Sequence, residues 1–197
     1  MHAGCMMHRM RLYRYGGLAL ACLLTPMPIV LSAPPDKTML GIALDAPFAA
    51  PACSPREVSI SARICFNADM IDRKPWGAQE YYVSLPSGGT PPHVRGELRV
   101  AVVRGVVESI QVGTWGIQAQ GGALATLTQK YGQPARARKE THRALRSRLP
   151  TQYAEWDFDD FTVKLDGTTG SIDWGRIEVA MRRYHKLVSD HGAAALK

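Results

Sequence analysis

The side chains best suited to chemistry in this 197-residue chain are four clustered carboxylates, Glu155, Asp157, Asp159 and Asp160. Carboxylates at this spacing can bind Ca²⁺, or can act as the acid and base of a hydrolase. Alternation around Trp156, however, places Glu155 and Asp157 on the outer face of a strand, and Asp-Asp is typical of a turn. We therefore expect solvated side chains here, and a hydrolase using the carboxylates near Asp157 is an alternative.

The motifs of well-known catalytic sites do not occur in the chain. It contains no Gly-x-Ser-x-Gly, no Ser-x-x-Lys, no His-Glu-x-x-His and no glycine-rich phosphate loop. His185 and His191 lie six positions apart, which on a helix does not bring them to one face. We predict a protein that is not an enzyme, with no catalytic residue, no bound metal and no cofactor.

A run of basic residues is the second candidate for chemistry. Between positions 136 and 148 a single acid, Glu140, accompanies six basic residues: Arg136, Arg138, Lys139, Arg143, Arg146 and Arg148. Such a run can contact an anionic lipid, an acidic glycan or an acidic protein surface. The alternative is a solvated loop or a short exposed helix, because charged runs usually face water. The run has no interleaved aromatic residues of the kind that stack on bases, so we expect no nucleic-acid partner.

Trp115 is a candidate anchor for a partner. It lies in a loop between Gly113 and Gly116, and exposed Trp is enriched at the centres of protein interfaces. Burial in the core is an equal alternative. Trp156, which alternates with other apolar residues, is instead expected in the core.

Cys53 and Cys65 are predicted to form one disulfide. Eleven residues separate them and no His lies nearby, which matches no common metal-binding spacing. The alternative is a metal-binding or catalytic thiol pair. A disulfide requires an oxidising compartment, and we expect it to stabilise the fold by about 2–3 kcal/mol.

Residues 1–32 predict an export signal that is removed from the mature protein. They contain three basic and no acidic residues, with an apolar run over 18–31 that two prolines interrupt. This is the pattern of a secretory signal peptide, and the run is too short to cross a membrane comfortably. We expect cleavage between Ser32 and Ala33, with Met10 as an alternative start.

Cys22 lies in a segment that resembles the lipid-attachment box of bacterial lipoproteins. Because the apolar run continues well past Cys22, removal with the signal is favoured over lipidation. Residues 33–197 then carry 21 Lys and Arg against 17 Asp and Glu, a net charge of +4 instead of +7. This small surplus does not imply nucleic-acid binding.

Hydrophobic periodicity predicts a mixed fold built around residues 98–134. Period-two alternation predicts strands, the first of them as a strand or a turn, at 39–44, 58–66, 81–85, 98–102, 106–112, 154–158, 161–165 and 177–181. A helix is expected over 122–131, with Gly132 as its C-cap, and a second from Arg182. Glu108 is a misfit on an apolar strand face. It is either a buried carboxylate kept for a ligand, or a strand end, bulge or exposed edge.

We therefore predict that residues 33–197 form one exported α+β domain. It contains a single antiparallel sheet of five or more strands, with the 122–131 helix and the C-terminal helix on one face. A loop at 86–93 divides the half bearing the disulfide from the central hairpin and helix.

The order of the predicted elements also resembles that of small exported bacterial domains. A hairpin, a helix ending Lys130-Tyr131-Gly132-x-Pro134, a basic segment, a hairpin with Ala-x-Trp156 and a last strand follow one another between Leu98 and Met181. This is similar to the small outer-membrane-assembly lipoproteins and to proteins of the β-lactamase-inhibitor type. The resemblance implies a protein that binds other proteins at the cell envelope and catalyses nothing.

The predicted function is non-catalytic binding in the bacterial cell envelope, as an inhibitor, immunity or assembly accessory protein. The expected partner is an envelope protein, and the expected location is the periplasm or the exterior. An alternative is a peripheral protein that binds an anionic lipid or glycan surface through residues 136–148. No transmembrane helix is expected in the mature chain.

Overall fold

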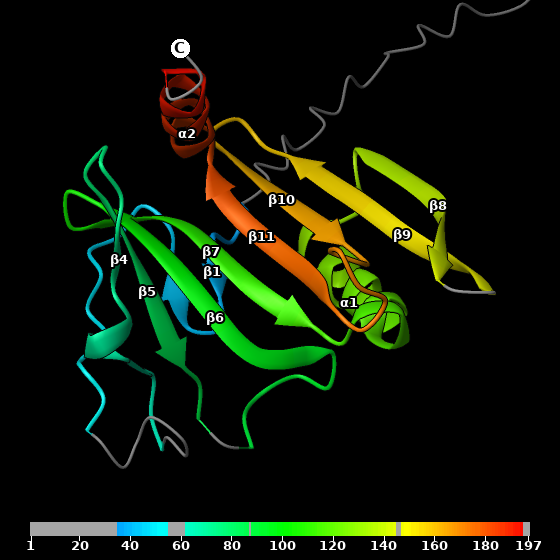
Figure 1. Ribbon diagram of the computed structural model, residues 1–197, viewed down its shortest axis with the longest axis horizontal. Helices are drawn as coiled ribbons and strands as arrows, with labels where there is room; N and C mark the ends of the chain where they lie inside the picture. The colour runs from blue at the N-terminus through cyan, green and yellow to red at the C-terminus, as the bar shows by residue number, and fades with distance from the viewer. Residues whose placement is uncertain (1–34, 55–61, 87, 145–146, 195–197) are drawn as a thin grey trace, which may run out of the picture. The chain divides into compact units, whose positions relative to one another are not determined.

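One antiparallel sheet dominates the computed structural model, which describes residues 35–54, 62–86, 88–144 and 147–194 (Figure 1). Nine strands of this described part form the sheet in the order β3-β5-β6-β7-β11-β10-β9-β8, with β4 also paired to β5. The strands are β3 (Cys65–Phe66), β4 (Asp72–Arg73), β5 (Ala78–Ser84), β6 (Val94–Val103), β7 (Val106–Thr114), β8 (Arg136–Ala144), β9 (Ser147–Asp157), β10 (Phe161–Asp166) and β11 (Gly175–Met181). The predicted α+β class is correct, and the sheet is larger than the five strands taken as its minimum.

The remaining elements are a small hairpin and the helices. The hairpin is β1 (Thr38–Met39) with β2 (Ile42–Ala43), and the helices are η1 (Ala68–Met70), α1 (Gly116–Tyr131) and α2 (Arg182–Ala194). No helix in the described ranges is long and apolar enough to cross a membrane. The predicted leader, with Met10, Cys22 and the Ser32–Ala33 cleavage site, lies outside the described residues.

The central hairpin of β6 and β7 was predicted, but its register contains a bulge. Arg104 and Gly105 both have positive φ, of 53° and 83°, as a tight two-residue turn requires. Ala101 pairs with Ser109 and Val102 with Val107, so Glu108 is the extra residue. The bulge buries Val107 and leaves Val106 half-buried, which corrects the alternation expected for this strand.

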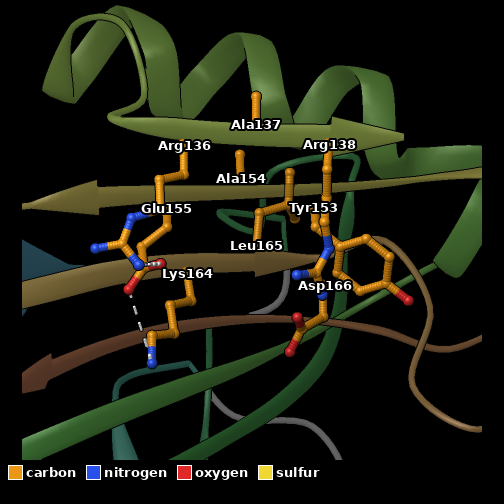
Figure 2. Close-up of a pocket in the computed structure, with 9 residues that line it drawn as sticks. All are labelled: Arg136, Ala137, Arg138, Tyr153, Ala154, Glu155, Lys164, Leu165 and Asp166. Atoms are coloured by element: carbon orange, nitrogen blue, oxygen red, sulfur yellow. Dashed lines mark hydrogen bonds and ion pairs between the residues drawn. The ribbon is translucent and has the colours of Figure 1, made fainter. Parts of the chain in front are cut away.

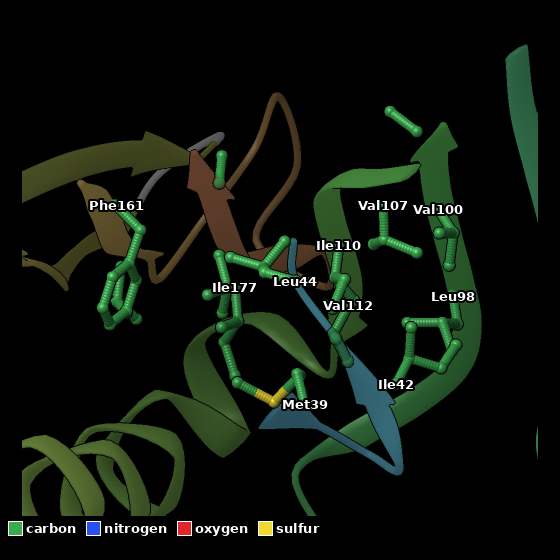
Figure 3. Packing of buried hydrophobic residues seen from close by; sticks show 14 of the residues in the cluster. Met39, Ile42, Leu44, Leu98, Val100, Val107, Ile110, Val112, Phe161 and Ile177 are labelled. Carbon is green, nitrogen blue, oxygen red and sulfur yellow. The ribbon is translucent and has the colours of Figure 1, made fainter. Parts of the chain in front are cut away.

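The core lies between one face of the sheet, α1 and the β1–β2 hairpin. Met39, Ile42 and Leu44 lie over the buried side chains of β6 and β7 (Figure 3). Trp156 is buried on the same face, as predicted, and its indole Nε1 donates to the carbonyl of Gly132, 2.8 Å away. A buried indole N–H thus meets an acceptor at the end of α1.

Helix α1 ends where predicted and begins earlier. Gly132 has φ 81° and follows the last helical residue, as expected of a glycine C-cap. The predicted start at 122 is wrong, because the helix runs from Gly116. Gly121 and Gly122, which discourage helix in isolation, both lie inside it.

Helix α2 packs on the opposite face of the sheet. His185 of α2 lies 3.1 Å from the Thr162 hydroxyl, measured from Nε2. Thr162 points away from its buried neighbours Phe161 and Val163, and Ser109 and Ala180 lie buried along the Thr162 face. The expectation that both helices cover one face is therefore wrong.

Residues 136–144 form the strand β8, so the expected loop or short helix is wrong there. β8 pairs with β9 over its whole length, from Arg136 opposite Glu155 to Ala144 opposite Ser147. Both faces of β8 carry charged or small residues, so no apolar period marks the strand. The hairpin of β9 and β10 was predicted and is confirmed.

The N-terminal half contains the predicted disulfide between Cys53 and Cys65, with Cα atoms 5.0 Å apart. Of the strand expected over 58–66, β3 contributes Cys65–Phe66, and residues 55–61 lie outside the described part. The described residues between β5 and β6 lie outside the helices and strands named above, where the sequence places the loop at 86–93.

Candidate functional site

Trp115, Arg95 and Trp174 form an exposed stack at one end of the sheet. The Arg95 guanidinium carbon lies 4.6 Å from the ring centroid of Trp115 and 3.4 Å from that of Trp174. The two indoles are 46% and 37% exposed. Trp115 is therefore exposed and is not part of the core, and we call these three residues the tryptophan–arginine stack.

Rigid elements position the stack. Trp115 connects β7 to α1 and donates its backbone N–H to the carbonyl of His93, 3.3 Å away. The next residue, Gly116, has φ +53°, and a Cβ there would lie 2.1 Å from the carbonyl oxygen of Ile172. This close approach fixes the start of α1 against the segment that carries Trp174. Arg95 in turn donates from Nη1 to the carbonyl of Asp173, at 3.1 Å.

A shallow hollow of about 610 Å³ adjoins Trp115. Pro92, His93, Ala119 and Gly122 line it, so small side chains on α1 leave room beside the indole. Burial lowers the pKa of His93 below its ordinary value and favours the neutral ring. The stack and hollow can therefore receive an apolar side chain beside a fixed cation, as protein interfaces do.

The hairpin of β8 and β9 carries a mixed polar surface on the same face of the sheet as α2 (Figure 2). The Arg136 guanidinium lies 3.4 Å from Glu155 and 3.8 Å from Asp157. Arg138 contacts Glu140 at 2.8 Å and lies over the Tyr153 ring at 4.6 Å from its centroid. A pocket of about 350 Å³ lies between these side chains.

Alternating charges continue across this face of the sheet. Directly paired residues from β8 to β6 form one row: Arg136, Glu155, Lys164, Glu178, Gln111 and Arg99. The face is therefore not a uniform cationic patch. Lys139 and Arg148 are exposed, whereas the side chains of Arg143 and Arg146 lie outside the described part, and Trp115 lies elsewhere, at the start of α1.

The clustered carboxylates mostly face cations. Arg182 binds Asp157, and Lys37 binds Asp160. Glu155 lies between Arg136 and Lys164, and Asp159 is exposed in the turn before β10. In the described ranges no group of three or more His, Cys, Asp or Glu side chains is placed to hold a metal. Glu155, Asp157 and Asp160 are therefore held in ion pairs with neighbouring cations.

Glu108 belongs to a charged cluster that the sequence only partly reveals. It is 7% exposed and accepts two hydrogen bonds from Arg183 Nε, at 2.9 and 2.8 Å. Arg183 Nη2 also reaches Asp45 at 2.5 Å. These bonds lower the pKa of Asp45 and raise that of Arg183. Glu108 is at a bulge, as one interpretation expected. It is also buried, but its carboxylate is bound by Arg183 and joins α2 to β7. Nothing in the sequence around Arg183 signals this pairing.

Comparison of the chain with family models, with curated proteins and with solved structures gives no match.

Proposed function

We propose that this protein is a non-catalytic binding protein of the bacterial cell envelope that holds a protein partner at the tryptophan–arginine stack. The observation that carries the proposal is the exposure of two indoles that both lie against one guanidinium. Trp and Arg are the side chains that contribute most to protein interfaces when a partner covers them.

The stack is organised before a partner binds, which favours affinity. Arg95 is already held by two rings and by the carbonyl of Asp173, so little side-chain entropy remains to be lost on binding. Two large indoles offer apolar area to bury, and the guanidinium keeps donors for a polar partner group. Inhibitors and assembly accessory proteins act through such a fixed contact surface and catalyse no reaction.

The envelope location is supported by the disulfide. Cys53 and Cys65 are bonded in the fold, and such bonds persist in oxidising compartments. An export signal over residues 1–32, expected from the sequence, is part of the same proposal. The proposal also includes an inhibitor, immunity or assembly role. It further includes removal of Cys22 with the signal, so that no lipid is attached there.

Capture of a partner from envelope extract tests the proposal. The wild-type protein should retain one partner in stoichiometric amount. Trp115→Ala combined with Trp174→Ala should weaken its binding about thirtyfold or more, since one interface hot spot contributes about 2 kcal/mol.

The matched control removes two other exposed apolar side chains. Met70 and Val188 are 50% and 38% exposed and lie on η1 and α2, away from the stack. Met70→Ala with Val188→Ala should leave capture unchanged. Equal capture by the tryptophan variant and the control would contradict the proposal, as would the absence of any stoichiometric partner.

A further inference from the structure

β8 forms a long, open edge of the sheet. It lies last in the strand order and spans nine residues without a proline. All six residues from 136 to 141 are exposed. Within the described part of the chain no strand pairs with its outer side. An edge of this kind presents unpaired N–H and C=O groups to another chain.

At the opposite edge of the sheet, β3 is covered on its outer side. β3 has two residues. Phe66 donates its backbone N–H to the carbonyl of Pro51 at 2.9 Å, and its own carbonyl accepts from the N–H of Cys53 at 2.8 Å. The other strand at this edge, β4, has only two residues, so β8 is the longer open edge.

Gln120 of α1 identifies which groups of β8 face outward. Its buried amide donates to the carbonyl of Pro150 at 2.9 Å and accepts from the N–H of Gln152 at 2.8 Å. Positions 150 and 152 of β9 therefore direct their backbone away from β8. Because backbone direction alternates along a strand, positions 149, 151 and 153 face β8.

The register then fixes the outer groups of β8. Positions 149, 151 and 153 pair with 142, 140 and 138, so these three residues of β8 bond inward. Ala137, Lys139 and Thr141 consequently present their N–H and C=O groups to solvent. These backbone groups can form hydrogen bonds with one more strand, either antiparallel or parallel.

Charge decides what can occupy the edge. The described side chains of β8 include three basic residues and one acidic residue: Arg136, Arg138 and Lys139 against Glu140. A second copy of β8 would place basic side chains beside basic ones, which is unfavourable for directly opposed residues. An acidic strand would instead place carboxylates within reach of these cations.

We infer that β8 binds an extended acidic segment of the partner protein by strand addition, with carboxylates at alternate positions beside Arg136 and Arg138. The inference rests on the proposed function, because it gives the binding protein a second contact surface and states the chemistry of the partner there. On this inference, the basic residues of β8 belong to the strand to which the partner's segment is added.

A proline substitution on the outer side of β8 distinguishes binding through backbone hydrogen bonds from binding through charge. Ala137 carries no charge and its N–H points outward, so Ala137→Pro removes a docking donor and leaves the β8–β9 bonds intact. The probe is a synthetic peptide of alternating Glu and Thr, about nine residues long to match β8. Titration calorimetry should show binding to the wild type that is weakened roughly tenfold or more in Ala137→Pro.

The charge variants and the second proline complete the test. Arg138→Glu should also weaken binding, because Arg138 lies on the face to which the carboxylates of the peptide are directed, whereas Arg73→Glu, on exposed β4, should not. A peptide with Lys in place of Glu should not bind. Thr141→Pro serves if Ala137→Pro does not fold. In the wild type, amide exchange at Lys139 and Thr141 should slow when the acidic peptide is added.

Three results would overturn the inference. The first is equal peptide binding by wild type and a folded proline variant, which would show attraction by charge alone. The second is binding to phosphatidylglycerol vesicles without binding to the peptide. The third is unchanged amide exchange at saturating peptide. None of these involves the tryptophan–arginine stack, so partner capture through the stack can succeed while strand addition fails.

Discussion

His185 is a half-buried titratable residue whose environment disfavours its charged form. Burial, the largest effect, lowers the pKa of its imidazole below the ordinary value of 6.5, and Lys164 and Arg182 act in the same direction. Glu178 and Glu155 oppose them. The unfolded chain therefore binds a proton at a higher pH than the folded protein does.

The folded protein should accordingly lose stability as the pH falls below about 6.5, the value in unfolded chains. Replacing His185 by Gln keeps a polar group near Thr162 and removes the proton, so the free energy of unfolding should vary less between neutral and mildly acidic pH. Denaturant unfolding at several pH values measures this. Lys186→Gln, at the exposed neighbouring position, is the control, and equal pH dependence in His185→Gln and wild type would contradict the expectation.

Single residues were predictable where one local rule decides them. Gly132 ends a helix because a C-cap requires positive φ, and Trp156 is buried because its strand alternates. Glu108 was recognisable as a misfit, but its partner Arg183 lies 75 positions away. No local pattern reports a contact at that separation, so the charged cluster could not be predicted.

At the level of elements, α1 contains two glycines at which substitution by alanine should have opposite effects on stability. Gly116 has positive φ, and a Cβ there would clash with the carbonyl of Ile172, whereas Gly121 has open space around it. Gly116→Ala should destabilise the protein by more than about 2 kcal/mol. Gly121→Ala should stabilise it by about 0.5–1 kcal/mol, because Ala loses less conformational freedom in a helix. Thermal melts of both variants test this pair, and equal effects of the two changes would contradict it.

The start of α1 and the strand β8 show why some features of the fold were not predicted from the sequence. A helix start at Gly116 depends on contact with residue 172, which sequence spacing does not record. β8 has charged or small residues on both faces, so neither a two-residue nor a helical period appears. The hairpins with one apolar face, β6–β7 and β9–β10, were predictable because burial of that face imposes the alternation.

Across the whole molecule, the disulfide lies at the β3 edge of the sheet, apart from both proposed contact surfaces. It joins the segment before residue 54 to β3. The stack depends on the ends of β6, β7 and β11, and the docking edge depends on β8, β9 and Gln120. The disulfide should therefore affect stability without affecting binding.

Replacing Cys53 and Cys65 by Ser should lower the free energy of unfolding by about 3 kcal/mol, because an unfolded chain without this short loop has more conformational freedom. Reductant should lower the stability of the wild type by a similar amount and leave the variant unchanged. Titration of the folded variant with the acidic peptide should give the same affinity as the wild type. Weaker binding by a folded variant would show that closing the β3 edge also shapes β8 through the sheet, and reductant without effect on the wild type would show that the bond constrains little in the unfolded chain.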